Sequence, residues 1–183
     1  ATNGLRFVSL FLLSLLAFNS LYPVIFLPAI ILILEQHSCL NQKTPTNDIP
    51  VHTKFLRPSM ILNVAIFVTF VTIYFFVCNK FEPTESPFYT IYGFALRIGD
   101  LTPNIGLFWY FFTEIFDHFR DFFIWVFQIN TFIFVIPLSV RFWKDPFFLC
   151  LSLLFLHSLF KPYPTFSDFV LYLSLLPQWS HLF

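Results

Sequence analysis

The sequence predicts an all-α membrane protein, a multi-pass bundle of transmembrane helices. Of its 183 residues, 57% are hydrophobic and 22% aromatic, whereas only 11% are charged. Soluble domains carry roughly 25% charged residues, so this chain has too few charges to cover a surface that faces water. The mean hydropathy is +0.76, and the hydrophobic residues gather in runs that approach the roughly 20 residues a transmembrane helix needs.

The composition also excludes several classes of function. Ten basic and ten acidic residues cancel, so there is no electrostatic basis for binding nucleic acid. The three cysteines form neither a CxxC pair nor a zinc-binding pattern. No nucleophile triad, phosphate loop or HExxH motif is present. We therefore predict no catalytic residues, no cofactor and no nucleic-acid partner.

The ends of the chain suggest a piece of a longer protein. The chain begins at Ala1 without a methionine and stops at Phe183 inside a hydrophobic stretch. We interpret residues 1–183 as a single multi-span membrane domain, an internal fragment that lacks the N- and C-terminal parts of its fold.

The first hydrophobic run, Phe7–Leu34, contains no charged residue. As one helix it would be about 42 Å long at about 1.5 Å per residue, which exceeds the hydrocarbon core of roughly 30 Å. Pro23 and Pro28 interrupt the run, because proline removes a backbone donor and disrupts the preceding turn. The run predicts either one kinked, strongly tilted span or two half-spans.

Polar loops and a clear span follow. Residues 35–58 hold three basic residues and the breakers Pro45 and Pro50, so we expect a loop there. Met60–Asn79 is free of charges and rich in Val, Ile and Phe, which predicts a membrane span. Residues 80–106 form a second loop, with amphipathic material around Tyr89–Arg97.

The last part of the chain predicts one long helix and two shorter ones. Leu107–Val140 is helical in pattern, but its first half carries several charges, so only Phe122–Val140 can easily cross lipid. Two shorter apolar runs, Phe147–Phe160 and Phe169–Phe183, follow a polar link at residues 141–145.

The basic residues orient these segments. Loop 35–58 holds three Lys or Arg residues and link 141–145 holds two, and both segments lie on the same side of the predicted topology. The other side holds Lys80, Arg97 and Lys161 among more acidic residues. The positive-inside rule places that side in the cytosol and loop 80–106 on the luminal face. Arg141 and Lys144 are then predicted interfacial anchors, with phospholipid phosphate as a candidate partner.

One group of charges falls inside the long helix. Glu114, Asp117, His118 and Asp121 stand at positions i, i+3, i+4 and i+7, which share one helical face. The face could be a solvated interfacial surface, or it could line a cavity that holds a polar lipid headgroup. A metal site is a third interpretation, although one histidine among carboxylates is a weak signal.

A turn rich in hydrogen-bonding groups comes directly before that helix. Pro103 and Gly106 predict the turn, and Asp100, Thr102 and Asn104 carry polar side chains. The simplest interpretation is helix capping, in which Thr102 or Asn104 accepts a hydrogen bond from an amide of the first turn.

Residues 100–119, DLTPNIGLFWYFFTEIFDHF, closely resemble the most distinctive stretch of the PIG-U (phosphatidylinositol glycan class U) family. This family supplies a subunit of the glycosylphosphatidylinositol (GPI) transamidase. The resemblance extends to further short stretches, namely SLYP at Ser20–Pro23, FQIN at Phe127–Asn130, IPL at Ile136–Leu138, YPT at Tyr163–Thr165 and P-x-W-x-H-L at Pro177–Leu182.

The resemblance implies a multi-pass protein of the endoplasmic reticulum membrane with a fold like that of the GPI mannosyltransferases. It implies a non-catalytic subunit that helps recognise or present the GPI lipid, while another subunit performs the transfer. The implied partners are the other transamidase subunits, the GPI glycolipid and phospholipids. On this basis the candidate lipid contacts are Asp100, Asn104, Glu114, Asp117 and His118.

Two alternative functions stay open at the level of sequence. The chain could belong to an active lipid-linked-sugar (dolichol-phosphate-mannose-type) glycosyltransferase, which would need a luminal carboxylate. Asp100 could fill that role, but Asp-Leu-Thr-Pro-Asn is not the signature of those enzymes. The other alternative is a purely structural scaffold subunit.

Overall fold

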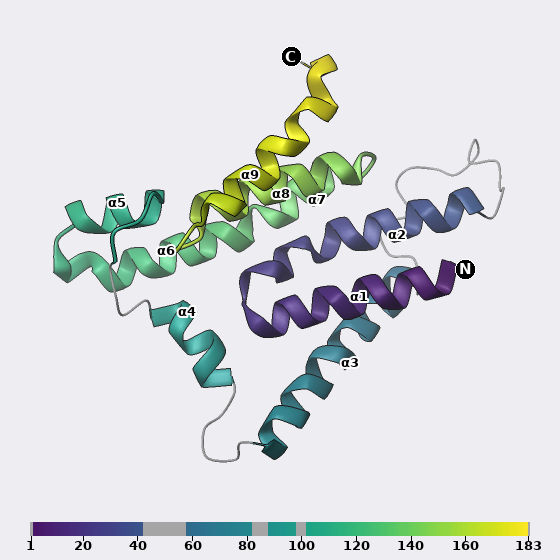
Figure 1. Cartoon of the computed structure of the whole chain (residues 1–183), viewed down its shortest axis with the longest axis horizontal. Coiled ribbons are helices and arrows are strands. Elements are labelled where there is room, and N and C mark those ends of the chain that lie inside the picture. The colour runs from purple at the N-terminus through teal and green to yellow at the C-terminus, as the bar shows by residue number, and fades with distance from the viewer. Residues whose placement is uncertain (1, 42–57, 82–87, 98–101, 183) are drawn as a thin grey trace. The chain divides into compact units, whose positions relative to one another are not determined.

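The computed structural model describes residues 2–41, 58–81, 88–97 and 102–182, and the regular elements in these ranges are all helical (Figure 1). The all-α prediction is therefore confirmed for the described residues. Two compact units form, Ala1–Pro87 and Phe88–Phe183, and each is described by itself. The single multi-span domain stays a prediction.

In the first unit the Phe7–Leu34 run folds into two helices rather than one kinked helix. The elements are α1 (Thr2–Asn19), the short 3-10 helix η1 (Tyr22–Phe26), α2 (Leu27–Asn41) and α3 (Pro58–Phe81). The chain reverses at η1, where Pro23 lies in the first turn, and α2 runs back antiparallel to α1 (Figure 1). At the open end of this hairpin Arg6 Nη2 donates a hydrogen bond to Ser38 Oγ at 3.3 Å.

The loop predicted to start at residue 35 starts later, because α2 continues to Asn41. The prediction ended the helix at the first charged residue, Glu35. In the structure the Glu35 side chain is buried, with 7% exposure, and Ser38 Oγ donates to the carbonyl of Leu34 inside the helix. The polar residues of this turn therefore belong to the hairpin rather than to a loop.

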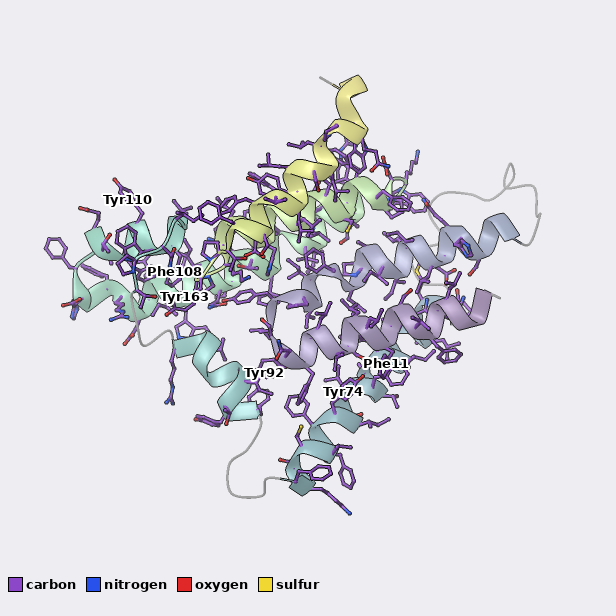
Figure 2. All side chains as sticks on the ribbon, viewed as in Figure 1. Phe11, Tyr74, Tyr92, Phe108, Tyr110 and Tyr163 are labelled. Carbon is purple, nitrogen blue, oxygen red and sulfur yellow. The ribbon has the colours of Figure 1, made fainter. Side chains whose placement is uncertain are left out.

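The helix α3 packs along α1 through apolar and aromatic side chains. Rings stack edge to face at Phe11–Phe70, with centroids 5.6 Å apart, and the ring of Tyr74 lies 6.0 Å from that of Phe11 (Figure 2). The buried cluster of this unit consists of Leu10, Leu13, Ala17, Leu34 and Phe67. Such contacts leave most of α3 uncovered.

Two helical stretches are long and apolar enough to cross a membrane by length and composition. One is Pro58–Phe81, which contains the predicted span Met60–Asn79, and the other is Asp117–Arg141, which contains Phe122–Val140. Only 11% and 22% of their most apolar windows are buried. Most of these apolar side chains are therefore exposed in the described part of the chain, and exposed apolar surfaces of this kind mark sites of contact with lipid or with other protein.

The second unit contains the remaining helices. They are the π-helical turn η4 (Tyr89–Gly93), α4 (Phe94–Arg97), α5 (Leu107–Glu114), the 3-10 turn η5 (Asp117–Phe119), α6 (Arg120–Ile133), α7 (Val135–Arg141), α8 (Pro146–Phe160), α9 (Phe166–Leu175) and the 3-10 segment η6 (Leu176–Leu182). The break between α6 and α7 falls at Phe134, ahead of Pro137, whose ring nitrogen cannot donate to the preceding turn.

The run Phe147–Phe160 becomes part of α8. The run predicted from Phe169 forms most of α9 and, after Leu175, the 3-10 segment η6. The helices α8 and α9 pack on each other. The rings of Phe155 and Tyr172 meet at 90° with centroids 5.4 Å apart. The second of these helices starts at Phe166, earlier than the predicted Phe169, because Asp168 belongs to its first turn and not to the preceding link.

Candidate functional site

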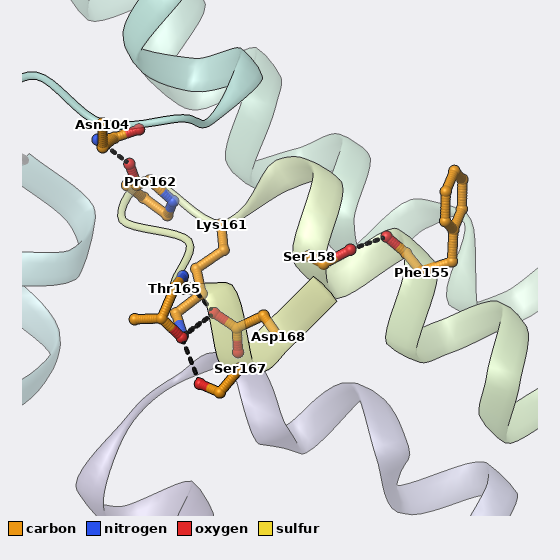
Figure 3. Close-up of polar contacts among 8 residues, drawn as sticks. All are labelled: Asn104, Phe155, Ser158, Lys161, Pro162, Thr165, Ser167 and Asp168. Atoms are coloured by element: carbon orange, nitrogen blue, oxygen red, sulfur yellow. Dashed lines mark hydrogen bonds and ion pairs between the residues drawn. The ribbon is translucent and has the colours of Figure 1, made fainter. Parts of the chain in front are cut away.

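Two loops of the second unit meet beside the most distinctive stretch of the sequence. The side-chain amide of Asn104 donates to the carbonyl of Pro162 at 3.2 Å, across 58 residues of chain (Figure 3). The same amide donates to the carbonyl of Thr102 at 3.3 Å. Asn104 Oδ1 accepts a hydrogen bond from the Gly106 amide at 2.8 Å. We call residues 102–106 and 161–165 the loop junction.

Asn104 therefore serves the turn, though not in the predicted way. The prediction was that Asn104 accepts a hydrogen bond from an amide of the first helical turn. In the structure Asn104 accepts instead from the amide of Gly106, the residue that precedes α5. Thr102 contributes its backbone carbonyl. The side chain of Asn104 thus closes the turn and joins it to the second loop.

Glycine at position 106 is required by the close approach of the two loops. A Cβ atom on Gly106 would lie 2.6 Å from Cγ of Pro164 and 2.9 Å from Oδ1 of Asn104. Real Cβ contacts are essentially never this short. The two loops can meet at this distance only because the residue has no side chain.

The second loop of the junction leads into a capped helix. The Thr165 amide donates to Asp168 Oδ2 at 2.7 Å, and the Thr165 hydroxyl donates to the same oxygen at 2.8 Å. Lys161 Nζ also lies 2.9 Å from Asp168 Oδ2 as an ion pair. Figure 3 shows these bonds at the start of α9. Together with the reciprocal bond from the amide of Asp168, they form a capping box.

The contacts of Asp168 favour its charged form. Burial alone would raise the pKa of the Asp168 carboxyl. The backbone amide of Thr165, the ammonium of Lys161 and the hydroxyl of Thr165 outweigh burial and lower that pKa below its ordinary value. Neither Lys161 nor Asp168 was predicted as a site residue, although Thr-x-x-Asp before an apolar run is a recognisable capping signal.

An aromatic cluster holds α5 against α6. Phe108 is 2% exposed, and its ring stacks on Phe112 with centroids 4.2 Å apart. Phe108 also meets Phe127 edge to face at 5.5 Å, and Phe111 meets Phe123 at 5.1 Å. These pairs require α5 to run back along α6, so the two helices form a short hairpin.

This hairpin overturns the prediction of one continuous helix from Leu107 to Val140. The helix α5 ends at Glu114, because Ile115 (φ −85°, ψ 147°) and Phe116 (φ −67°, ψ 138°) are extended. The predicted polar stripe, Glu114 to Asp121, is therefore not one helical face. Burying the phenylalanines of α5 against α6 is more favourable than continuing the helix through residues 115 and 116. The hydrophobic pattern of the sequence does not show that the chain reverses there.

The stripe residues lie instead on and around the connection between the two helices. Glu114 ends α5, and Asp117 and His118 lie in η5. All three are exposed, and Asp121 is exposed in the first turn of α6. Among the described residues there is no group of three or more His, Cys, Asp or Glu side chains that could hold a metal ion.

The remaining candidate residues have simpler surroundings. Arg141 is exposed in the last turn of α7, and Lys144 is exposed in the link before α8. In that link Asp145 Oδ1 caps α8 by accepting from the amide of Phe148 at 3.2 Å. Asp100 lies outside the described residues.

A cavity of about 500 Å³ borders the loop junction. Its walls come from the junction, α5, α8 and α9, and they include Asn104, Gly106, Trp109, Tyr110, Ser158 and Phe169. The few polar groups stand among aromatic ones, as is usual for pockets that take a partly apolar ligand.

Comparison with known proteins places the chain in a family. Residues 1–183 match the family described as GPI transamidase subunit PIG-U. The "GPI-anchor transamidase component PIGU" of Homo sapiens is 36% identical over 188 residues, which cover 99% of this chain and 40% of that protein. The "GPI transamidase component GAB1 homolog" of Schizosaccharomyces pombe is 54% identical over 78 residues, which cover 43% of this chain and 19% of that protein.

The "GPI transamidase component GAB1" of Saccharomyces cerevisiae is 40% identical over 96 residues, covering 51% of this chain and 24% of that protein. The chain spans about 40% of the length of the mammalian relatives it matches. The match nevertheless runs over all of its residues. The chain belongs to the PIG-U family of GPI transamidase subunits.

Proposed function

We propose that the chain forms part of a non-catalytic membrane subunit of GPI transamidase, which helps to recognise or present the GPI lipid. The observation that carries the proposal is the PIG-U family match over residues 1–183, together with relatives whose names describe them as components of that transamidase. The apolar spans at Pro58–Phe81 and Asp117–Arg141 support a place in the membrane.

The connection between α5 and α6 is the part best suited to meet a polar lipid headgroup. Glu114 and Asp117 present two exposed carboxylates there. The second candidate span begins at Asp117, so these groups would lie near the membrane surface. A GPI glycan carries amino groups, and a carboxylate can pair with an ammonium group at an interface at modest desolvation cost.

The loop junction has a positioning role in this proposal. Asn104 uses both ends of its amide within the junction, so it holds the start of α5 in place rather than reaching a ligand. The aromatic cluster then fixes α5 on α6. The adjoining cavity could accept an apolar part of the lipid beside Trp109 and Tyr110.

The test is a double substitution, Glu114→Gln with Asp117→Asn, in the full-length protein within its complex. Both amides keep the size and most hydrogen bonds of the carboxylates. A charge-assisted hydrogen bond contributes about 1.5–3 kcal/mol, so GPI recovered with the purified complex should fall by roughly tenfold or more. Asp145→Asn is the matched control, because it removes an exposed carboxylate elsewhere while asparagine still caps a helix well.

Two outcomes would contradict this role for the connection. Unchanged GPI recovery with normal assembly would make Glu114 and Asp117 a solvated surface. Loss of assembly with the double variant, but not with Asp145→Asn, would mean that these carboxylates hold partner subunits.

The wider proposal places this subunit in the endoplasmic reticulum membrane as a multi-pass protein, with catalysis in another subunit and with further transamidase subunits and phospholipids as partners. Depletion of the protein in cells distinguishes a transamidase subunit from a glycosyltransferase. For a transamidase subunit, we expect unprocessed proproteins to accumulate together with complete GPI precursors. Truncated glycan intermediates would indicate a sugar transferase instead.

A further inference from the structure

A second cavity of the second unit, with polar and aromatic walls, lies away from the loop junction. It has a volume of about 610 Å³ and is formed by η4, α4 and α6. Aromatic side chains make up much of its wall, with one cation, Arg97, and one anion, Asp121. Neither the PIG-U resemblance nor the proposed GPI contact accounts for this cavity.

The two charges line the same cavity without pairing with each other. Among the described residues Lys161 and Asp168 form an ion pair, whereas Arg97 and Asp121 do not. The guanidinium of Arg97 lies 5.5 Å from the centre of the Tyr89 ring instead. A cation–π contact orients the guanidinium without using its N–H groups, which are the groups that bind an anion.

Asp121 could have a purely structural explanation. It stands in the first turn of α6, where a carboxylate complements the positive end of the helix. That effect does not explain why Arg97, which forms no ion pair with Asp121, lines the same cavity. Two opposite charges that line one cavity complement a ligand that carries both signs.

The position of the cavity relative to the candidate span indicates which ligand would reach it. Asp121 lies near the start of the candidate span Asp117–Arg141, which places it at the level of lipid headgroups. Trp125, about one turn further along α6, and Tyr89 supply the aromatic rings that are typical of the membrane interface. A lipid headgroup is therefore the natural occupant.

We propose that this cavity binds the headgroup of phosphatidylethanolamine. Arg97 binds the phosphate through its guanidinium N–H groups, because the planar fork matches phosphate oxygens. Asp121 accepts hydrogen bonds from the ethanolammonium group. A volume of about 610 Å³ lies within the roughly 300–1,000 Å³ usual for small-ligand sites and leaves space for the glycerol part of the lipid.

The experiment uses the full-length protein in its purified complex, without GPI. Phosphatidylethanolamine with a diazirine near the acyl carbonyl is photo-crosslinked, and the modified peptides are mapped by mass spectrometry. A phosphatidylglycerol probe with the same acyl chains serves as the anionic comparison. Because no GPI is present, failure here is independent of the proposed GPI recognition.

Crosslinks from phosphatidylethanolamine are expected on peptides containing residues 88–97 and 121–125. Arg97→Gln should lower the yield from both probes by roughly tenfold, since a charge-assisted bond is lost. Asp121→Asn should lower only the phosphatidylethanolamine yield by a similar factor, and Asp121→Glu should restore most of it. The controls Lys80→Gln and Asp145→Asn remove exposed charges of the same signs elsewhere and should change neither yield.

Assembly of each variant is checked by size-exclusion chromatography, so a loss of crosslinking is counted only where the complex is intact. The proposal is overturned if Arg97→Gln and Asp121→Asn both leave the phosphatidylethanolamine yield on these peptides unchanged. It is also overturned if phosphatidylglycerol labels them as well as phosphatidylethanolamine does, since the cavity would then be a general anion site.

Discussion

In the first unit, α1, α2 and α3 pack mainly through aliphatic and aromatic side chains, whereas in the second unit two loops are also joined by hydrogen bonds of defined geometry. In the hairpin of the first unit, a side-chain cross-link joins Arg6 to Ser38. The second unit combines its junction with a capped helix and an ion pair.

The difference bears on how each region should respond to mutation. Dispersion and hydrophobic contacts are non-directional, so apolar substitutions of similar size are tolerated. Hydrogen-bonded loops at close approach tolerate little change in shape. We therefore expect the second unit to lose stability on small changes that the first unit accepts.

The largest difference is expected between two glycines changed to alanine. In the second unit, Gly106→Ala places a Cβ atom against Pro164, and overpacking of this kind costs about 1–3 kcal/mol. In the first unit, Gly4→Ala in α1 meets nothing within 4 Å and should gain at most about 0.5–1 kcal/mol from helix propensity. Thermal unfolding of the detergent-solubilised full-length protein measures both, and equal effects would show that the junction is not tightly packed.

The next largest effect concerns the start of α9. Asp168→Ala removes the acceptor of the Thr165 amide and of Lys161, and loss of such a cap costs about 1–2 kcal/mol. Ser38→Ala removes the acceptor of the Arg6 cross-link in the first unit. It should cost less, about 0.5–1.5 kcal/mol, because only a single bond of 3.3 Å is lost. If both substitutions cost the same, the ion pair of Lys161 adds nothing to the cap.

At the start of α9, the contribution of Asp168 to stability should depend on pH. The Arg6–Ser38 cross-link of the first unit should show no such dependence. The pKa of Asp168 is lowered in the folded protein, so its contribution is fully present above the unfolded pKa of about 3.9 and is lost as the pH falls through the folded value. Asp168→Asn should remove this part of the acid sensitivity. Unfolding curves at decreasing pH that stay parallel for the two proteins would refute it.

Much of the fold follows from hydrophobicity alone. The charge-free run Met60–Asn79 lies within α3, and Phe122–Val140 lies within the helical stretch Asp117–Arg141, which comprises η5, α6 and α7. Both are long enough to span a membrane. A run of apolar residues with few breakers leaves the backbone little alternative to a helix in lipid. The ends of helices were less predictable, as Glu35 and Asp168 show, because a charged residue can be part of a helix when the fold supplies its partner.

The candidate site was harder to predict for a different reason. The spacing of Glu114, Asp117 and His118 fits one helical face, but the chain turns back at Ile115 and Phe116. That turn depends on the ring contacts of Phe108 with Phe127 and of Phe111 with Phe123. Local periodicity contains no information about such tertiary contacts.

A smaller effect, of opposite sign, is expected at a buried amide of the first unit. Asn63 in α3 is fully buried, and neither atom of its side-chain amide has a hydrogen-bond partner in the described part of the chain. Asn63→Leu should raise stability by about 1 kcal/mol, since an unsatisfied buried polar group is replaced by an apolar one. Gln128→Leu in α6 is the matched comparison.

Gln128 is also buried, but it has an interaction partner. Its replacement should therefore lower stability, and thermal unfolding of the two variants measures the contrast. Destabilisation by Asn63→Leu as well would mean that the amide binds a group outside the described residues. The first unit would then share the directional bonding of the second.

The smallest effect is expected from the basic residues at the end of the second span. Arg141 and Lys144 are exposed, and a basic residue near an anionic lipid surface contributes only about 1 kcal/mol, part of which salt screens. Reversing both charges, Arg141→Glu with Lys144→Glu, should reduce the phospholipid that co-purifies with the complex by roughly two- to threefold. Lys80→Glu at the end of α3, where the cation lies 5.6 Å from the Phe76 ring, is the comparison in the first unit and should leave lipid retention unchanged.

If both variants retain lipid as the unmodified protein does, Arg141 and Lys144 only orient the chain in the membrane. If both lose lipid equally, the phospholipid contacts are not specific to the second unit, and the two units differ in their internal bonding alone.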